Sequence, residues 1–321
     1  MISPERLLST YRRAGADPPF GDPRRHHGVP MEGYFWRLTD VRSGRVVVAF
    51  TGVSRDAVGA TWATVGLAEH PGGLVRTVVA PHAAADHERL GVRVGTQLRA
   101  DEDGLDVDLG PGACLRVRFT ERVGWPRRAL GGVGLGHVVP GLGQYWHPHM
   151  LDARVEGAAQ LGERRVELTG ARAYGEKNWT PYARGFPSLW WWGQAHGFAR
   201  EDVAVAFAGG RMFGIPAGAV VVRLGDELVH VVGPPAALSM RLDENRWALR
   251  ARTLRDVVTL AGDADGAPFR FPVPVPRERR AAADVSAMHL AGRVHLVVRR
   301  GGTVRFAGTS RLAGLEQGRE G

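Results

Sequence analysis

Glycine and proline interrupt this chain so often that long regular elements have little room to form. The 321 residues include 44 glycines and 20 prolines. Between them lie short segments rich in valine, threonine and aromatic residues, and turn signals recur roughly every 8–12 residues, which is typical of β-sandwiches and β-barrels. We predict strands at 44–52, 73–81, 104–110, 113–121, 164–170, 202–210, 217–225, 226–233, 246–253 and 293–308.

A helical pattern is visible only at the N-terminus. Ser3 is placed to cap a short helix, Pro4 suits its first turn, and Gly15 suits its end. The glycine pair at 301–302 divides the β-rich segment 293–308 into two parts and predicts a tight hairpin between them. The predicted fold class is therefore all-β with one short N-terminal helix.

The number of predicted strands exceeds one eight-stranded barrel, so we expect two β domains. The segment 175–187 is polar and irregular, contains Pro181 and Pro187, and is the best candidate for the joint. We predict an N-terminal domain at 1–180 and a C-terminal domain at 181–321, meeting near residues 176–187. Ligand sites are common where two such units meet.

Composition excludes several classes of protein. One cysteine, Cys114, permits neither an intrachain disulfide nor a cysteine-rich zinc site. No apolar run approaches the ~18 residues that cross a membrane, and the first residues lack the apolar segment of a secretory signal, so we expect a cytoplasmic protein.

The net charge of +9 comes from scattered arginines, and the densest cluster is Arg277–Arg280. No nucleic-acid-binding pattern accompanies them, so we expect a generally basic surface and no nucleic-acid partner. Such a surface would favour peripheral contact with anionic lipid.

One lysine stands among 41 arginines. Lys177 lies between Glu176 and Asn178, directly before Trp179, and three consecutive tryptophans follow at 190–192. An acid, an ammonium and an amide beside so much indole are unusual for a plain hydrophobic core. The residues from 171 to 198 are therefore the candidate functional segment.

The same segment resembles the hallmark of the tocopherol cyclase family, in "ARAYGEKNW" (171–179) followed by "FPSLWWWGQAHGF" (186–198). Three further blocks resemble the family in the same order: "MEGYFWRL" (31–38), "GLGQYWHPHMLDARVEGAAQL" (141–161) and "TSRLAGLEQG" (309–318). The likeness extends over nearly the whole chain. Gly175 departs from it, because a small hydroxyl residue is common at that position.

The resemblance implies two lipocalin-like, calycin-type β-barrel or sandwich domains and a cofactor-free cyclisation. In such a reaction an acid protonates an alkene of a prenylated hydroquinone, and the phenol oxygen closes on the tertiary cation. Distant relatives are thought to hydrate carotenoids or to catalyse pericyclic closures in natural-product pathways. We accordingly expect a hydrophobic terpenoid or prenylated aromatic substrate, no metal and no organic cofactor.

An aromatic wall suits this chemistry, because indole faces stabilise a cation without trapping it. If the residues after Pro187 form a strand, alternate side chains share one face. Trp190, Trp192, Gln194, His196 and Phe198 would then line a pocket, while Trp191 and small residues pack behind. Simple packing between domains is the alternative.

A water-poor pocket also raises the pKa of a carboxyl group and keeps its proton available. We predict Glu176 as the proton donor, followed by Asp152, with Glu32 and Glu156 as further candidates. Lys177 and Asn178 would orient the phenol. Alternatively, Glu176 pairs with an arginine and Lys177 points to solvent.

Histidines upstream of the hallmark add to the predicted site. His147 and His149 would share a strand face with Tyr145, where they line the pocket or transfer protons; a zinc site lacks a third ligand. The segment 26–28 is predicted as a polar loop near the pocket mouth. The predicted substrate-binding residues are Glu32, Tyr34, Trp36, Tyr145, Trp146, His147, His149, Tyr174, Trp179, Trp190, Trp192, Gln194, His196 and Phe198.

Two alternatives to a non-redox cyclase of the isomerase class stay open. One is a lipocalin-like carrier of a hydrophobic prenylated molecule, which needs the cavity but no acid. The other is a pericyclase or isomerase that only folds its substrate. Hydrolase, kinase and dehydrogenase motifs are absent from the sequence.

Overall fold

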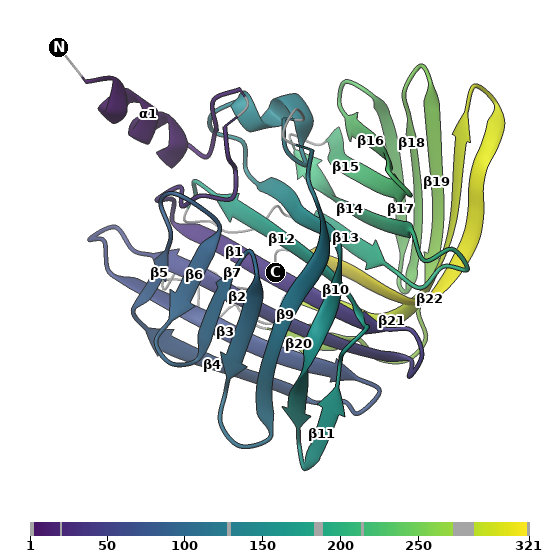
Figure 1. Cartoon of the computed structure of the whole chain (residues 1–321). Helices are drawn as coiled ribbons and strands as arrows, with labels where there is room; N and C mark the ends of the chain where they lie inside the picture. Colours follow the sequence, from purple (N-terminus) through teal and green to yellow (C-terminus); the bar gives the residue numbers. More distant parts are fainter. Residues whose placement is uncertain are drawn as a thin grey trace. The chain divides into compact units, whose positions relative to one another are not determined.

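The computed structural model describes residues 3–19, 21–126, 130–182, 189–212, 215–271 and 286–319, and most of these lie in antiparallel strands (Figure 1). The helical elements among them are α1 (Pro4–Arg13) and a short 3₁₀ helix, η1 (Gly134–Val138). No described helix has the length and apolar character needed to cross a membrane. The predicted all-β class is confirmed.

The strands of the first half are β1 (Met31–Asp40), β2 (Arg45–Arg55), β3 (Thr61–His70), β4 (Val75–Pro81), β5 (Ala83–Ala85), β6 (Gly91–Val94), β7 (Leu98–Asp101), β8 (Gly104–Asp108), β9 (Ala113–Gly124), β10 (Tyr145–Leu161), β11 (Arg164–Glu167) and β12 (Arg172–Thr180). Those of the second half are β13 (Leu189–Ala195), β14 (Val203–Met212), β15 (Ile215–Leu224), β16 (Glu227–Gly233), β17 (Ala237–Asp243), β18 (Arg246–Arg252), β19 (Asp256–Asp263), β20 (Phe269–Phe271), β21 (Ser286–Arg300) and β22 (Thr303–Arg319).

Local signals placed the helix and the hairpin correctly. The Ser3 side chain accepts a hydrogen bond from the backbone N–H of Arg6 and so caps α1. Gly15 follows the helix with a φ of +89°, a conformation that glycine adopts without strain. Gly301 and Gly302 both have positive φ and turn the chain from β21 into β22.

The first sheet contains 12 strands in the order β4-β3-β2-β1-β12-β10-β9-β8-β7-β6-β5, with β11 beside β10. Its two edge strands, β4 and β5, are separated in the chain by His82 alone. The sheet must therefore curl round until its edges approach each other, which gives a nearly closed barrel. Apolar side chains from most of these strands fill its interior.

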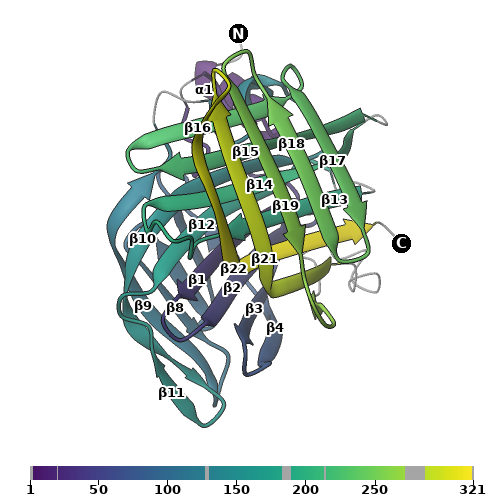
Figure 2. The same cartoon turned by 90° about the vertical axis from the view of Figure 1, so that its right-hand side faces the viewer.

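The second sheet contains 10 strands in the order β16-β15-β14-β13-β22-β21-β19-β18-β17, with β20 beside β21 (Figure 2). Its edge strands, β16 and β17, are also neighbours in the chain, so this sheet curls in the same way. A separate apolar core lies on one of its faces.

The chain divides into two compact units, each built on one sheet. The first includes the described residues of 3–40 and 47–182, and the second those of 41–46, 189–271 and 286–319. The junction near 183–188, which contains Pro187, and the basic cluster at 277–280 lie outside the described residues. The meeting of the two units near 176–187 stays a prediction.

The predicted joint at 175–187 is corrected in its first half. Residues 172–180 form β12, which is hydrogen-bonded to β1 on one side and to β10 on the other. Two neighbouring strands satisfy its backbone groups, and this tertiary pairing overrides the local polarity that suggested a loop. The hallmark segment is thus a central strand.

Candidate functional site

The two faces of β12 separate residues that are neighbours in the sequence. Ala173 belongs to the core of the first unit, so Gly175, Lys177 and Trp179 share its face, called here the core face. Glu176 and Asn178 lie on the opposite face. The predicted trio of acid, ammonium and amide is therefore not brought together.

The strands beside β12 add predicted residues to both faces. The register places Tyr34 and His147 opposite Lys177, and Glu32 and Tyr145 opposite Trp179. The predicted residues on the core face are Glu32, Tyr34, Trp36, Tyr145, His147, His149, Lys177 and Trp179, and those on the opposite face are Trp146, Tyr174, Glu176 and Asn178.

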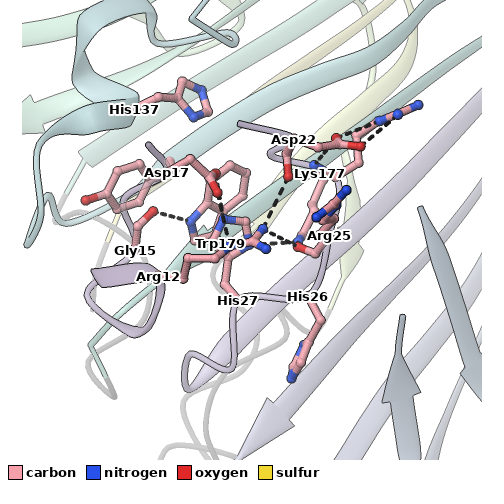
Figure 3. Close-up of polar contacts among 12 residues, drawn as sticks. Arg12, Gly15, Asp17, Asp22, Arg25, His26, His27, His137, Lys177 and Trp179 are labelled. Atoms are coloured by element: carbon pink, nitrogen blue, oxygen red, sulfur yellow. Dashed lines mark hydrogen bonds and ion pairs between the residues drawn. The ribbon is translucent and has the colours of Figure 1, made fainter. Parts of the chain in front are cut away.

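Lys177 is fully buried and anchors a chain of charged and polar groups (Figure 3). Its Nζ lies 2.8 Å from Oε2 of Glu32 and donates to Nδ1 of His27 at 3.0 Å and to the carbonyl of Arg25 at 2.5 Å. Burial lowers the pKa of Lys177, and Glu32 partly offsets this effect. The alternative in which Lys177 points to solvent is therefore wrong. Its ammonium lies on the other face of β12 from Glu176, away from the predicted acid.

Glu32 is held as an ionised carboxylate. Its Oε1 accepts from the backbone N–H groups of His27 at 2.9 Å and Gly28 at 3.1 Å, and lies 2.6 Å from Nδ1 of His26. Burial would raise the pKa of Glu32, but the Lys177 ammonium and His26 bring it well below its usual range. Glu32 is thus unsuited to donate a proton, which removes it as a candidate acid.

The segment 12–28 packs against the core face through Trp179. The imidazole of His27 stacks on this indole at 4.2 Å between ring centroids, and Tyr145 stacks on it at 5.4 Å. The indole N–H donates to the carbonyl of Gly15 at 2.8 Å, and Nε2 of His27 lies 2.8 Å from Asp17 (Figure 3). Residues 26–28 form a loop, as predicted, and this loop is bound into the network; its place at a pocket mouth stays a prediction.

His147 and His149 also lie on the core face. Both are buried, and neither Nδ1 of His147 nor Nε2 of His149 has a hydrogen-bond partner among the described residues. Burial lowers the pKa of His147 well below its usual range and that of His149 to about 3. A Cβ on Gly175 would lie 2.6 Å from Cε1 of His149, so glycine lets the imidazole approach β12. No group of three metal-binding side chains is formed within the described ranges.

These neutral imidazoles predict a stability that falls on mild acidification. Burial also lowers the pKa of His27 to about 4. Below the unfolded pKa of 6.5, the unfolded chain binds protons at His27, His147 and His149 that the folded chain does not bind. The free energy of unfolding should therefore fall by up to ~1.4 kcal/mol per pH unit for each histidine, before carboxylates titrate below roughly pH 5.

Urea unfolding at neutral pH and at about pH 5.5 measures this effect. His149→Asn should reduce the slope by about one residue's share. A free energy of unfolding that stays constant over this interval would contradict the neutral, buried state of these imidazoles.

The opposite face places an acid among aromatic side chains. Oε2 of Glu176 accepts hydrogen bonds from the indole N–H of Trp146 at 2.7 Å and from the Tyr174 hydroxyl at 2.6 Å, and the residue is only 4% exposed. Asn178 lies two residues further along this face, where its Oδ1 accepts from Gln144 at 3.3 Å. The structure thus places a carboxyl group in contact with an indole and a phenol, and the role of Glu176 as proton donor stays a prediction.

The other candidate acids of this unit have different surroundings. Arg172 binds Asp152 with two nitrogens, Nε to Oδ1 at 2.8 Å and Nη2 to Oδ2. The Arg172 guanidinium thus binds both oxygens of a fully buried carboxylate. The pair connects β10 to β12, and Asp152 is not placed to supply a proton. Glu156 is exposed on β10 and lacks an apolar environment.

The tryptophans of β13 alternate as predicted. Trp191 and Ala195 belong to the core of the second unit. A Cβ on Gly193 would lie 2.3 Å from the ring of Phe207, so this face is tightly packed. The other face carries Trp190, Trp192 and Gln194, and the Gln194 amide lies 3.2 Å from Nδ1 of His196.

Phe198 does not share the face of Trp190. Strand β13 ends at Ala195, and Gly197 has a φ of +78°, so the alternation stops before Phe198. Its ring instead packs in the core against Phe306, edge to face, at 5.5 Å between centroids. Phe198 is thus a core residue of the second unit.

Sequence reasoning missed one acid, Glu316 on β22. Its Oε1 accepts from the indole N–H of Trp190 at 2.8 Å and from the Ser286 hydroxyl at 2.7 Å. Burial raises the pKa of Glu316, although these two donors lower it in part. The signal in the sequence was an acid directly after Leu315, a core residue of the strand. Both lie in the block 309–318, which resembles the family.

Comparisons with known proteins agree with this architecture. A family model described as tocopherol cyclase-like matches residues 121–319. Kievitone hydratase from Nectria haematococca is similar in structure, with a TM-score of 0.51 and 9% identity over 91% of this chain and 89% of that one. A putative AttH protein from Nitrosomonas europaea has a TM-score of 0.54 and 12% identity over 92% and 94%. No curated protein matches the sequence.

Proposed function

The chain belongs to the tocopherol cyclase-like family, and on this premise we propose that it is a cyclase that protonates an alkene in a hydrophobic substrate and closes a ring on the resulting cation. The substrate class is a prenylated aromatic, hydroquinone-like molecule or a polyene terpenoid. The observation that carries the proposal is the buried carboxyl of Glu176, with Trp146 and Tyr174 hydrogen-bonded to it.

The proposed reaction needs one acid and no change of oxidation state. Glu176 transfers its proton to the less substituted alkene carbon, which leaves a tertiary cation and a carboxylate. The phenol oxygen attacks the cation, a C–O bond forms, and the phenolic O–H bond breaks. That proton returns to the carboxylate, so the product is an isomer of the substrate and the enzyme is regenerated.

The surroundings of Glu176 support these steps. The hydrogen bond from Tyr174 orients the carboxyl group, and the indole of Trp146 presents a ring that attracts positive charge without acting as a nucleophile. We assign Asn178, on the same face, to a hydrogen bond with an oxygen of the substrate. Lys177 acts on this site only through the position of β12.

Hydration is the second candidate, because water would capture the same cation that a phenol captures. The structural likeness to kievitone hydratase, whose name states a hydratase, gives the reason to test it. Exclusion of water from an apolar site favours ring closure over hydration.

Turnover in heavy water tests the proposed function. With a prenylated hydroquinone as the probe, the ring-closed product should carry one deuterium, at the former alkene carbon, because only the enzyme's exchangeable acid supplies that hydrogen. Mass spectrometry and NMR of the product locate it.

The other outcomes of this experiment contradict the proposal in distinct ways. A cyclised product without deuterium would indicate a pericyclic closure, in which the protein only folds its substrate. Oxygen-18 from labelled water in the product would identify a hydratase. Saturable binding of the probe, with no product from any prenylated aromatic or polyene tested, would indicate a carrier.

A further inference from the structure

The second unit repeats, on its own sheet, the arrangement that surrounds Glu176. In each unit one carboxylate oxygen accepts both an indole N–H and a hydroxyl. For Glu316 the donors are Trp190 and Ser286, at 2.8 and 2.7 Å. Of these three residues, only Trp190 belongs to the site predicted from the sequence.

Only one oxygen of Glu316 is used in this way. Among the described residues, none hydrogen-bonds to Oε2, and the side chain is partly rather than fully buried. Oε1 is therefore held by two donors, while Oε2 keeps its hydrogen-bonding capacity for a ligand. A carboxyl group oriented through one oxygen presents the other in a defined direction.

Close packing holds Trp190 in place for this contact. The register sets Gly318 opposite Trp190, and a Cβ on Gly318 would lie 1.9 Å from Cζ2 of the indole. The indole therefore lies directly over the glycine, with its N–H directed to Glu316. Trp192 is the register partner of Glu316 itself. Trp190 and Trp192 thus lie on the same face of the sheet as Glu316, and both are buried.

No described charged group stabilises the ionised form of Glu316. The groups that face it are Trp190 and Trp192 from β13 and Ser286 and Met288 from β21, and no described basic side chain forms an ion pair with it. Burial raises its pKa accordingly. A neutral carboxyl carries an O–H, so its free oxygen donates a hydrogen bond rather than accepting one.

We propose that Glu316 forms a second binding subsite, in which the free carboxyl oxygen donates a hydrogen bond to a neutral oxygen acceptor, such as a quinone or other carbonyl oxygen, on an apolar ligand that contacts Trp190 and Trp192. The choice of ligand class rests on the proposed function. The subsite recognises a polar oxygen of a hydrophobic molecule, whereas the chemistry at Glu176 acts on an alkene.

Equilibrium binding by calorimetry tests this subsite without turnover. The probes are a prenylated benzoquinone and the matching prenylbenzene, which has the same shape but no ring oxygens. Glu316→Ala should weaken binding of the quinone by about 3–10-fold, the usual contribution of one hydrogen bond, and leave binding of the hydrocarbon unchanged. Glu316→Gln retains an N–H donor and should keep most of the quinone affinity.

The pH dependence provides a second readout. Affinity of the wild-type protein for the quinone should fall as pH rises through the pKa of Glu316, because ionisation removes the donor. Ser286→Ala removes a hydrogen bond that favours the ionised form, so the fall should move to higher pH. Glu316→Gln, which does not titrate, should show no fall.

Two outcomes would overturn the proposal: equal quinone affinity in the wild type and Glu316→Ala, each with a wild-type circular dichroism spectrum, or an affinity for the quinone that rises with pH. The Ser286→Ala shift keeps the test decisive if Glu316→Ala fails to fold. Deuterium incorporation in the product, together with an unchanged quinone affinity in Glu316→Ala, would reject the subsite but not the cyclase. A Glu316-dependent quinone preference without deuterium incorporation would reject the cyclase alone.

Discussion

Glu176→Gln should reduce turnover of a prenylated hydroquinone by about 10²–10⁴-fold, the usual contribution of a general acid. Glutamine has the same size and still accepts hydrogen bonds from Trp146 and Tyr174, so the aromatic surroundings of residue 176 should be preserved. It has no proton to transfer to an alkene. Affinity for the substrate should therefore change little while the rate constant for turnover falls.

Steady-state kinetics and direct binding measurements separate these two effects. Glu163→Gln is the matched control, because Glu163 is exposed in the turn between β10 and β11 and should tolerate the change. Turnover at the wild-type rate in Glu176→Gln would refute the proposed acid, and Glu316→Gln would then be tested in the same assay.

Lys177→Met should lower the free energy of unfolding by about 3–5 kcal/mol, the usual cost of leaving one partner of a buried ion pair unpaired. The substitution leaves the Glu32 carboxylate buried without its ammonium partner and removes the donor to the Arg25 carbonyl. It also loosens the contact through His27 that holds the N-terminal segment on the core face. Chemical unfolding followed by tryptophan fluorescence measures the loss.

A double variant distinguishes the cost of an unpaired charge from general damage. Lys177→Met combined with Glu32→Gln removes both charges but keeps an acceptor for the backbone N–H groups of residues 27 and 28, so it should be more stable than Lys177→Met alone. Arg116→Met, which breaks the exposed pair with Asp106, should change stability by no more than about 0.5 kcal/mol. A cost for Lys177→Met as small as that of Arg116→Met would contradict the anchoring role.

Much of the fold was predictable because its signals are local. The cap at Ser3, the glycine pair at 301–302 and the alternation of Trp190 to Gln194 depend on residues adjacent in the chain. The position of the sole lysine correctly indicated that its segment is not a plain hydrophobic core, because Lys177 is buried and paired with Glu32. Its role was not predictable, since the partner Glu32 is far away in the sequence.

The errors arose where pairing between distant strands decides the outcome. Residues 175–180 were interpreted as a polar joint, yet β1 and β10 make them a central strand. Once they form a strand, Glu176 and Lys177 must point to opposite faces, and the predicted catalytic trio separates. The prediction for Phe198 was wrong for the opposite reason. The strand alternation was assumed to continue to residue 198, but β13 ends at Ala195.

The sequence by itself determined the β class, the helix and hairpin ends, the alternating faces of β13 and the presence of an acid among aromatic residues. Tertiary structure alone decided which polar side chains meet: the ion pairs Lys177 with Glu32 and Arg172 with Asp152, and the hydrogen bonds of Trp190 and Ser286 to Glu316. The physical reason is that turn and alternation preferences act between neighbouring residues. The state of a buried carboxyl depends on the partners that strand pairing brings to it and on the water that the core excludes.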